Sequence, residues 1–242
     1  YPAHITRPEW GSNLVGTSIP WDPGFLPATG TDGQVILLDP ASGREWNLFQ
    51  VAFDGSTVTA TNGNLVPGSY WTKEDGFGPS RGCGIQYLAM LVRPEEIAQG
   101  VIEHALSVPI INTSGETYVA PATKLEHPDN PPGIPEGMRF ALDVTDDEIA
   151  VWAAGLPAEL SQRTRDSAVV IAHALRDYGW FITDTSGGAH FQFEDRFTAG
   201  SEWEALGLGE QSAGGLELPR DLLDGLITAS NIYAIVPSDE YP

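Results

Sequence analysis

The segment WFITDTSGGAHFQFE, residues 180–194, carries the clearest β-hairpin pattern in the sequence. Its first part, 180–184, is apolar and β-branched, and Thr185–Gly188 has the composition of a turn. The second part, 189–194, alternates apolar with polar side chains, as a half-buried strand does. The segment therefore predicts two antiparallel strands in a fold built mainly from sheet.

Short strand patterns separated by turn signals continue on both sides of this segment. Residues 34–39 and 44–53 flank the turn Pro40–Gly43 and predict a second hairpin. Other strand patterns cover 57–61, 101–111, 117–120, 138–144 and 232–236. Helical patterns are fewer and cover 93–100, 145–155 and 161–178, the second of which opens with a capping-box sequence at Thr145.

This distribution favours a mainly β fold, namely an antiparallel β-sandwich of jelly-roll type with one or two helices packed on the outside. A parallel βαβ architecture is the weaker alternative, because strands and helices do not alternate regularly. Residues 1–33 are rich in proline and glycine and predict an extended N-terminal arm packed on the domain. Residues 34–242 then form a single β-sandwich domain.

The charge balance excludes several partners. The chain has 12 Lys and Arg against 33 Asp and Glu, a net charge of −21. Nucleic acid is excluded because phosphate needs a basic surface, and an anionic membrane would repel the protein. The longest apolar stretch, 85–92, is far shorter than a membrane span.

The lone cysteine, Cys83, excludes an intramolecular disulfide and is expected to be a small buried side chain rather than a nucleophile. The sequence starts at Tyr1 rather than Met, which fits either a secreted protein after removal of a signal peptide or a truncated chain. The sequence contains no phosphate-binding glycine loop, zinc-protease motif or nucleophile elbow, and we expect neither cofactor nor metal ion.

The candidate catalytic residues are histidines and carboxylates. In a strand over 101–111, His104 lies on the apolar face, where a core histidine with one hydrogen bond gives the same pattern. Asp184 ends the strand 180–184, and we expect it to share one sheet face with His104 as the floor of a cleft. Glu194 and Glu96 are the other candidate acids.

The candidate substrate-binding residues are polar and aromatic. In a strand over 189–194, His190, Gln192 and Glu194 share a face, although a solvated outer face has the same pattern. Tryptophan rings stack on sugars but also fill cores. The residues expected to bind substrate are Gln34, Trp46, Gln50, Trp71, Tyr118, Trp180, His190 and Gln192.

The segments RGCGIQYLA (81–89), RPEEI (93–97) and GVIEHAL (100–106) resemble a pattern of secreted bacterial, often actinobacterial, jelly-roll-like proteins. The similarity covers residues 20–236 in the same order, and Gln34 stands where that group often has histidine. The resemblance implies a jelly-roll domain like those of extracellular glycan enzymes and lectins. It also favours His104 and Asp184 as residues of a functional site.

The leading hypothesis is a secreted glycoside hydrolase that acts on a largely neutral polysaccharide with two carboxyl groups. A polysaccharide lyase would instead use His104 or Tyr118 as a base, but the net charge of −21 disfavours polyanionic substrates. A non-catalytic glycan-binding module and a structural surface protein are the remaining alternatives.

Overall fold

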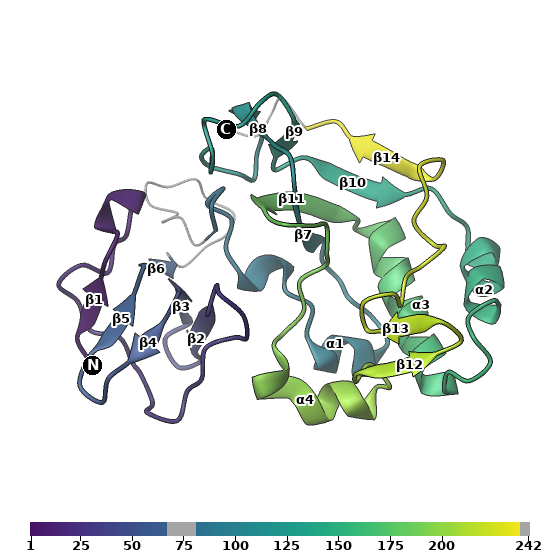
Figure 1. Ribbon diagram of the computed structural model, residues 1–242, viewed down its shortest axis with the longest axis horizontal. Helices are drawn as coiled ribbons and strands as arrows, with labels where there is room; N and C mark the ends of the chain where they lie inside the picture. Colours follow the sequence, from purple (N-terminus) through teal and green to yellow (C-terminus); the bar gives the residue numbers. More distant parts are fainter. Residues whose placement is uncertain (67–80, 238–242) are drawn as a thin grey trace.

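The computed structural model describes residues 1–66 and 81–237, and the chain forms two lobes with separate hydrophobic cores (Figure 1). The N-terminal lobe is drawn in purple and blue, and the larger C-terminal lobe in teal, green and yellow. Strands hold 28% of the residues and helices 21%, so the prediction of a mainly β protein is confirmed.

The N-terminal lobe consists of two small sheets. Its strands are β1 (Ala3–Ile5), β2 (Val35–Asp39), β3 (Arg44–Phe49), β4 (Ala52–Phe53), β5 (Val58–Ala60) and β6 (Asn62–Val66). The 3-10 helix η1 (Pro8–Trp10) lies in the connection between β1 and β2. One sheet has the order β2-β3-β6 and the other β1-β5-β4. The predicted hairpin of 34–53 is confirmed, because β2 and β3 pair antiparallel with Val35 opposite Leu48.

Residues 1–33 contribute to the core of this lobe. Leu14 and Trp21 are buried against Leu48 and Val58 because their large apolar surfaces are removed from water there. Strand β1 also pairs in parallel with β5. The first 33 residues are therefore a structural part of the N-terminal lobe.

The C-terminal lobe is built on a four-stranded sheet with the order β14-β10-β11-β7. These strands are β7 (Leu106–Ile110), β10 (Arg139–Leu142), β11 (Trp180–Thr185) and β14 (Ile232–Ile235). The short ladders are β8 (Thr113–Tyr118) with β9 (Ile134–Glu136), and β12 (Gln211–Ala213) with β13 (Leu216–Leu218). The helices are η2 (Leu88–Met90), α1 (Pro94–Gln99), α2 (Asp146–Ala154), α3 (Gln162–Asp177) and α4 (Arg196–Ala205).

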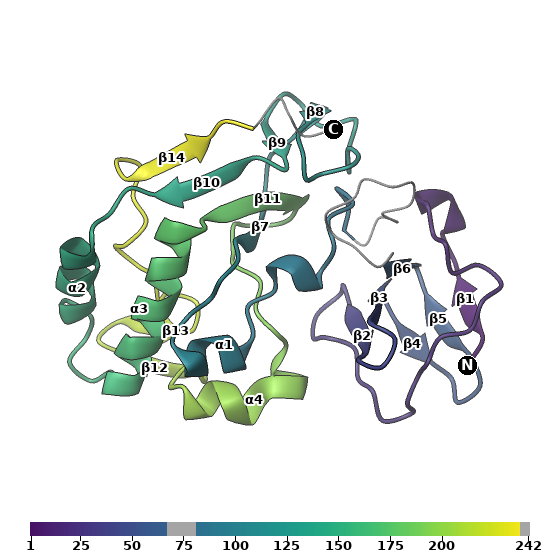
Figure 2. The ribbon, with the colours of Figure 1, turned by 180° about the vertical axis from the view of Figure 1, so that it is seen from behind.

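Helix α3 buries the apolar stripe that the sequence predicted against the sheet. Ile171 and Leu175 are fully buried in the same core as Trp180 and Ile182. Helix α2 lies on the side of this lobe that is remote from the N-terminal lobe, as both views show (Figures 1 and 2). None of the helices in residues 1–66 and 81–237 is long and apolar enough to span a membrane.

The jelly roll is not confirmed, because the strands of the described residues form five small sheets that do not close. Strands β7 and β11 also pair in parallel, whereas the strands of a jelly roll are antiparallel. Strand β11 is an interior strand of its sheet, because β10 pairs with it on one side and β7 on the other.

The hairpin predicted over 180–194 is wrong in its second half. Residues 189–194 form no strand that pairs with β11, and their one β-type pairing is an isolated parallel bridge between Phe193 and Val92. The alternating phenylalanines face the core instead, where Phe191 meets Trp180 and Phe193 stacks on Trp203. Alternation of apolar residues therefore reflected core packing and not a strand pair.

The parallel pair β7–β11 determines where functional groups meet. Because both strands run in the same direction, their carboxyl ends lie at the same edge of the sheet. The β8–β9 ladder follows at that edge, on the side toward the N-terminal lobe (Figure 2). The lobes contact each other through Asn47, whose Oδ1 accepts the Tyr87 N–H at 2.9 Å, and through Asp195, which binds Thr29.

Candidate functional site

His104 and Asp184 lie at opposite ends of the β7–β11 pair. His104 precedes the first residue of β7, whereas Asp184 is near the end of β11 and aligns with Pro109. The prediction that one sheet face carries both residues is therefore wrong. The physical reason is that strand β7 begins only at Leu106, so His104 takes no part in the strand alternation on which the prediction relied.

His104 is held by helix α1 instead. Its Nε2 lies 3.2 Å from Glu96 Oε1, and its Nδ1 lies 2.9 Å from the carbonyl oxygen of Ala105. Glu96 also accepts the backbone N–H of Arg93 at 2.9 Å and pairs with the Arg93 guanidinium at 3.0 Å. Burial works against ionisation of Glu96, but these hydrogen bonds hold its pKa below the usual value. Glu96 and His104 thus stabilise the start of α1 and the segment that follows it.

Glu194 and His190 lie in the connection between β11 and α4. Glu194 accepts a hydrogen bond from Thr198 Oγ1 at 2.8 Å, and its carbonyl oxygen accepts the Trp203 indole N–H at 3.0 Å. His190 is exposed, with its Nδ1 3.2 Å from the carbonyl oxygen of Gly188. Both contacts of Glu194 position the beginning of α4.

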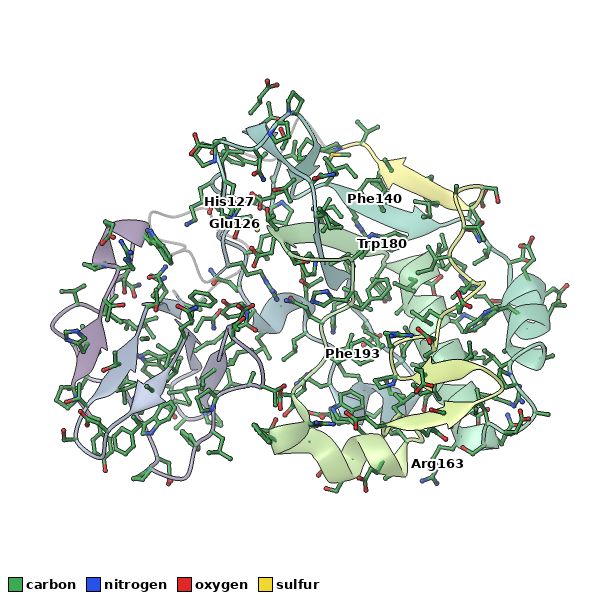
Figure 3. The ribbon with its side chains drawn as sticks, viewed as in Figure 1. Glu126, His127, Phe140, Arg163, Trp180 and Phe193 are labelled. Atoms are coloured by element: carbon green, nitrogen blue, oxygen red, sulfur yellow. The ribbon has the colours of Figure 1, made fainter. Side chains whose placement is uncertain are left out.

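Asp184 belongs to a cluster of three carboxyl groups, which we call the carboxyl cluster: Glu126, Glu136 and Asp184. One oxygen from each group lies within 4.8 Å of the others. Glu136 ends β9 and is fully buried, while Glu126 comes from the β8–β9 connection and its side chain is 19% exposed. Figure 3 shows Glu126 and His127 beside the end of β11, on the side that faces the N-terminal lobe.

Backbone contacts hold the carboxyl cluster together. Glu126 Oε2 accepts the Thr185 N–H at 2.7 Å, and Glu136 Oε2 accepts the Glu126 N–H at 3.1 Å. Gly137 permits this approach, because its φ is +85° and a Cβ there would lie 1.7 Å from the carbonyl oxygen of Val119. His127 Nε2 lies 3.3 Å from Glu126 Oε1 at the exposed side.

Burial and mutual repulsion favour the protonated forms of two of these acids. Burial, followed by the charge of Glu126, raises the pKa of Asp184 well above its usual value. Burial likewise raises the pKa of Glu136 to about 7. The neighbouring Glu126 side chain acts in the same direction on the pKa of Asp184, through its charge and through hydrogen bonding. The cluster can therefore both donate and accept a proton near neutral pH.

A buried polar network lies beside Asp184. The Arg81 guanidinium is 2% exposed, donates to the Tyr87 carbonyl oxygen at 3.1 Å and lies 4.7 Å from the centre of the Tyr87 ring. It also donates to Gln192 Oε1, which accepts a second hydrogen bond from Ser107 Oγ at 2.6 Å. The positive charge of Arg81 opposes the rise in the pKa of Asp184. Gln192 is thus part of the support of the site.

The aromatic residues that were predicted to bind substrate differ in their exposure to solvent. Trp46 and Trp180 are each 6% exposed, so neither ring is available to stack on a sugar. Trp180 instead stacks on Phe140 in the C-terminal core (Figure 3). Tyr118 is 44% exposed on β8 and aligns in register with Glu136, which places it at the same edge as the carboxyl cluster. Trp71 lies outside the described residues.

The two predicted glutamines in the N-terminal lobe have local roles. Gln34 hydrogen-bonds the Tyr87 side chain across the lobes. Gln50 accepts from Thr61 Oγ1 at 2.7 Å and donates to the carbonyl oxygen of Thr31 at 3.4 Å, and its φ is +53°. Gln50 therefore closes a turn between neighbouring strands.

The sequence reasoning missed Glu126 and Glu136. Both lie in or beside the proline- and glycine-rich stretch 127–137, and neither belongs to a motif of known spacing. Only the pairing of β8 with β9 brings them to Asp184. Carboxylate oxygens are also the ligands preferred by hard divalent cations, so these three residues are the set in the described chain that could hold one.

Comparisons of the chain with protein-family models, with curated proteins and with solved structures find no match. The interpretation of function therefore depends on the chemistry of the site.

Proposed function

We propose that this protein is secreted and hydrolyses glycosidic bonds, with Asp184 and Glu126 as its two carboxyl groups. The observation that carries the proposal is the close approach of these two groups, whose oxygens lie within 4.8 Å. Retaining glycosidases place their two carboxyl groups about 5–5.5 Å apart, whereas inverting enzymes leave room for a water molecule at about 6.5–9.5 Å. The separation of Asp184 and Glu126 lies below both ranges and is nearer to the retaining one, so retention of configuration is the outcome we propose.

The two residues have different environments, and this difference suggests their roles. Asp184 is half-buried with a raised pKa, which suits the acid that protonates the leaving oxygen. Glu126 is reached by solvent and accepts the Thr185 N–H, which suits the nucleophile that attacks the anomeric carbon. Asp184 would then act as the base that activates water in the second step.

The substrate class follows from charge and exposed rings. A net charge of −21 repels polyanions, so a largely neutral polysaccharide is the favoured substrate. The exposed ring of Tyr118, on the strand that aligns with Glu136, offers an apolar face for a sugar. Secretion is part of the same proposal and is supported by the acidic composition, which suits a protein that stays soluble outside the cell.

The test is incubation of the purified chain with a panel of neutral and acidic polysaccharides in EDTA. We expect new reducing ends from a neutral glycan, and we expect Glu126→Gln and Asp184→Asn each to lower turnover by about a hundredfold or more. The exposed Glu116→Gln is the matched control and should keep full activity.

Other outcomes identify the alternatives. Unsaturated products that absorb ultraviolet light would indicate a lyase, and binding without cleavage would indicate a glycan-binding module. Turnover that is unchanged in both Glu126→Gln and Asp184→Asn would remove the carboxyl cluster from the reaction.

A further inference from the structure

We propose that the carboxyl cluster binds one divalent cation of the calcium class through Glu126, Glu136 and Asp184. This inference goes beyond glycan hydrolysis and does not require it. It also departs from the sequence expectation that the protein carries no metal ion.

The spacing of the oxygens suits calcium. Ca²⁺ binds oxygen ligands at about 2.3–2.6 Å in flexible geometry, so oxygens on opposite sides of one ion are separated by about 5 Å. The three oxygens, each within 4.8 Å of the others, can therefore contact a single Ca²⁺. Mg²⁺ requires about 2.0–2.1 Å and a near-ideal octahedron, and it usually keeps several waters rather than binding in an all-protein site, so Ca²⁺ is the favoured ion.

A second observation, separate from the spacing, comes from Glu136. This side chain is fully buried, and its Oε1 has no hydrogen-bond partner in the described part of the chain. Burial of an acceptor without a partner is unfavourable, and more so for a charged group. Its other oxygen, Oε2, is used by the Glu126 N–H. A cation at the cluster would give Oε1 the partner that the protein does not supply.

The charges around the cluster leave room for a cation. Lys124 and Arg81 act on the cluster through their charges, but neither forms an ion pair with Glu126, Glu136 or Asp184 among the described residues. The three carboxyl groups thus lie within 4.8 Å of one another with no Lys or Arg paired to them in the described part of the chain. A divalent ion would offset the repulsion between them.

Cation binding and the proposed hydrolysis use the same oxygens. A bound Ca²⁺ would occupy the carboxyl oxygens of Asp184 and Glu126 that hydrolysis needs, so we expect CaCl₂ to inhibit hydrolysis. The two proposals are tested separately, because calcium binding is measured without glycan and hydrolysis is measured in EDTA.

The experiment is isothermal titration calorimetry, in which CaCl₂ is added to the full chain after treatment with EDTA and removal of the chelator, and the heat of binding is measured. We expect one saturable site in the wild type, weaker binding of MgCl₂, and a melting temperature that rises by several degrees with CaCl₂. Glu136→Gln should weaken calcium binding at least tenfold and abolish the thermal shift. Glu116→Gln removes the same charge from the exposed surface of β8 and should bind like the wild type.

Two results would overturn the proposal: no saturable binding by the wild type up to ~10 mM CaCl₂, about tenfold above the Kd of the weakest extracellular sites, or equal binding by Glu136→Gln and the wild type. The second result would assign the ion to other acidic groups of this highly charged chain. If circular dichroism shows that Glu136→Gln is unfolded, Asp184→Asn takes its place with the same expected loss of binding.

Discussion

At the scale of single residues, Cys83 shows how the environment decides reactivity. The thiol is completely buried, donates to the carbonyl oxygen of Thr183, and has a pKa that burial raises well above the usual value. We expect no reaction of native protein with an aromatic disulfide reagent at pH 8, and one equivalent after unfolding in guanidinium. An exposed cysteine introduced by Ser230→Cys should react at once, and equally fast labelling of native Cys83 would contradict the prediction.

Single residues were predictable from sequence where their surroundings are local. The burial of Cys83 was expected because no second cysteine and no nearby histidine stands at ligand spacing. Thr145 caps α2 as the capping-box sequence predicted, with its Oγ1 accepting the Glu148 N–H at 3.2 Å. Glu136 was not predictable, because a buried carboxylate in a proline- and glycine-rich stretch has the same sequence pattern as an exposed one. The partners that give it a role come from elsewhere in the chain.

At the scale of elements, Asp195 joins a helix end to the other lobe. Its Oδ1 accepts the Phe197 N–H at 2.8 Å as the N-cap of α4, and its Oδ2 accepts the Thr29 N–H and Oγ1 at 2.9 and 2.8 Å. We expect Asp195→Ala to lower the free energy of unfolding by about 1–3 kcal/mol, measured by urea unfolding at pH 7. Thr29→Val loses only the hydroxyl donor and should cost less.

The same residue gives a pH dependence with a definite sign. Burial opposes ionisation, but hydrogen bonds from Phe197 and Thr29 keep the pKa of Asp195 below its usual value. Stability from this group is therefore present above the unfolded-state pKa of about 4 and is lost as the pH falls through the lower folded-state pKa. The difference between wild type and Asp195→Ala should be constant from pH 5 to 7 and shrink below pH 4. A difference that grows on acidification would refute this assignment.

Elements were predicted better than their partners. The helices α1, α2 and α3 and the β2–β3 hairpin depend on signals within a few residues, such as caps, turns and periodicity. The partners of β11 depend on burial of both its faces, which residues 180–185 do not encode by themselves. This is why the hairpin over 180–194 was wrong although the strand itself was right.

At the scale of the whole molecule, the two cores differ in how their strands are connected. In the N-terminal lobe, β2 and β3 are joined by the turn Pro40–Gly43. The buried residues of the core of this lobe all lie between residues 14 and 60. In the C-terminal lobe, the sheet forms only when β7 meets β11, after β8, β9, β10, α2 and α3 have intervened in the chain. The candidate site depends on this late pairing, because Asp184 comes from β11.

The parallel pairing of β7 with β11 also affects the order in which parts of the molecule fold. Closing a long connection before any contact forms costs entropy, so distant pairings form more slowly than hairpins. We expect pulse-labelling hydrogen exchange during refolding to protect the β2–β3 amides first and the β11 amides later, with a slower rate constant. Simultaneous protection would show one cooperative unit. On a ribosome, the first lobe would be folded while the segment that completes the carboxyl cluster is still being synthesised.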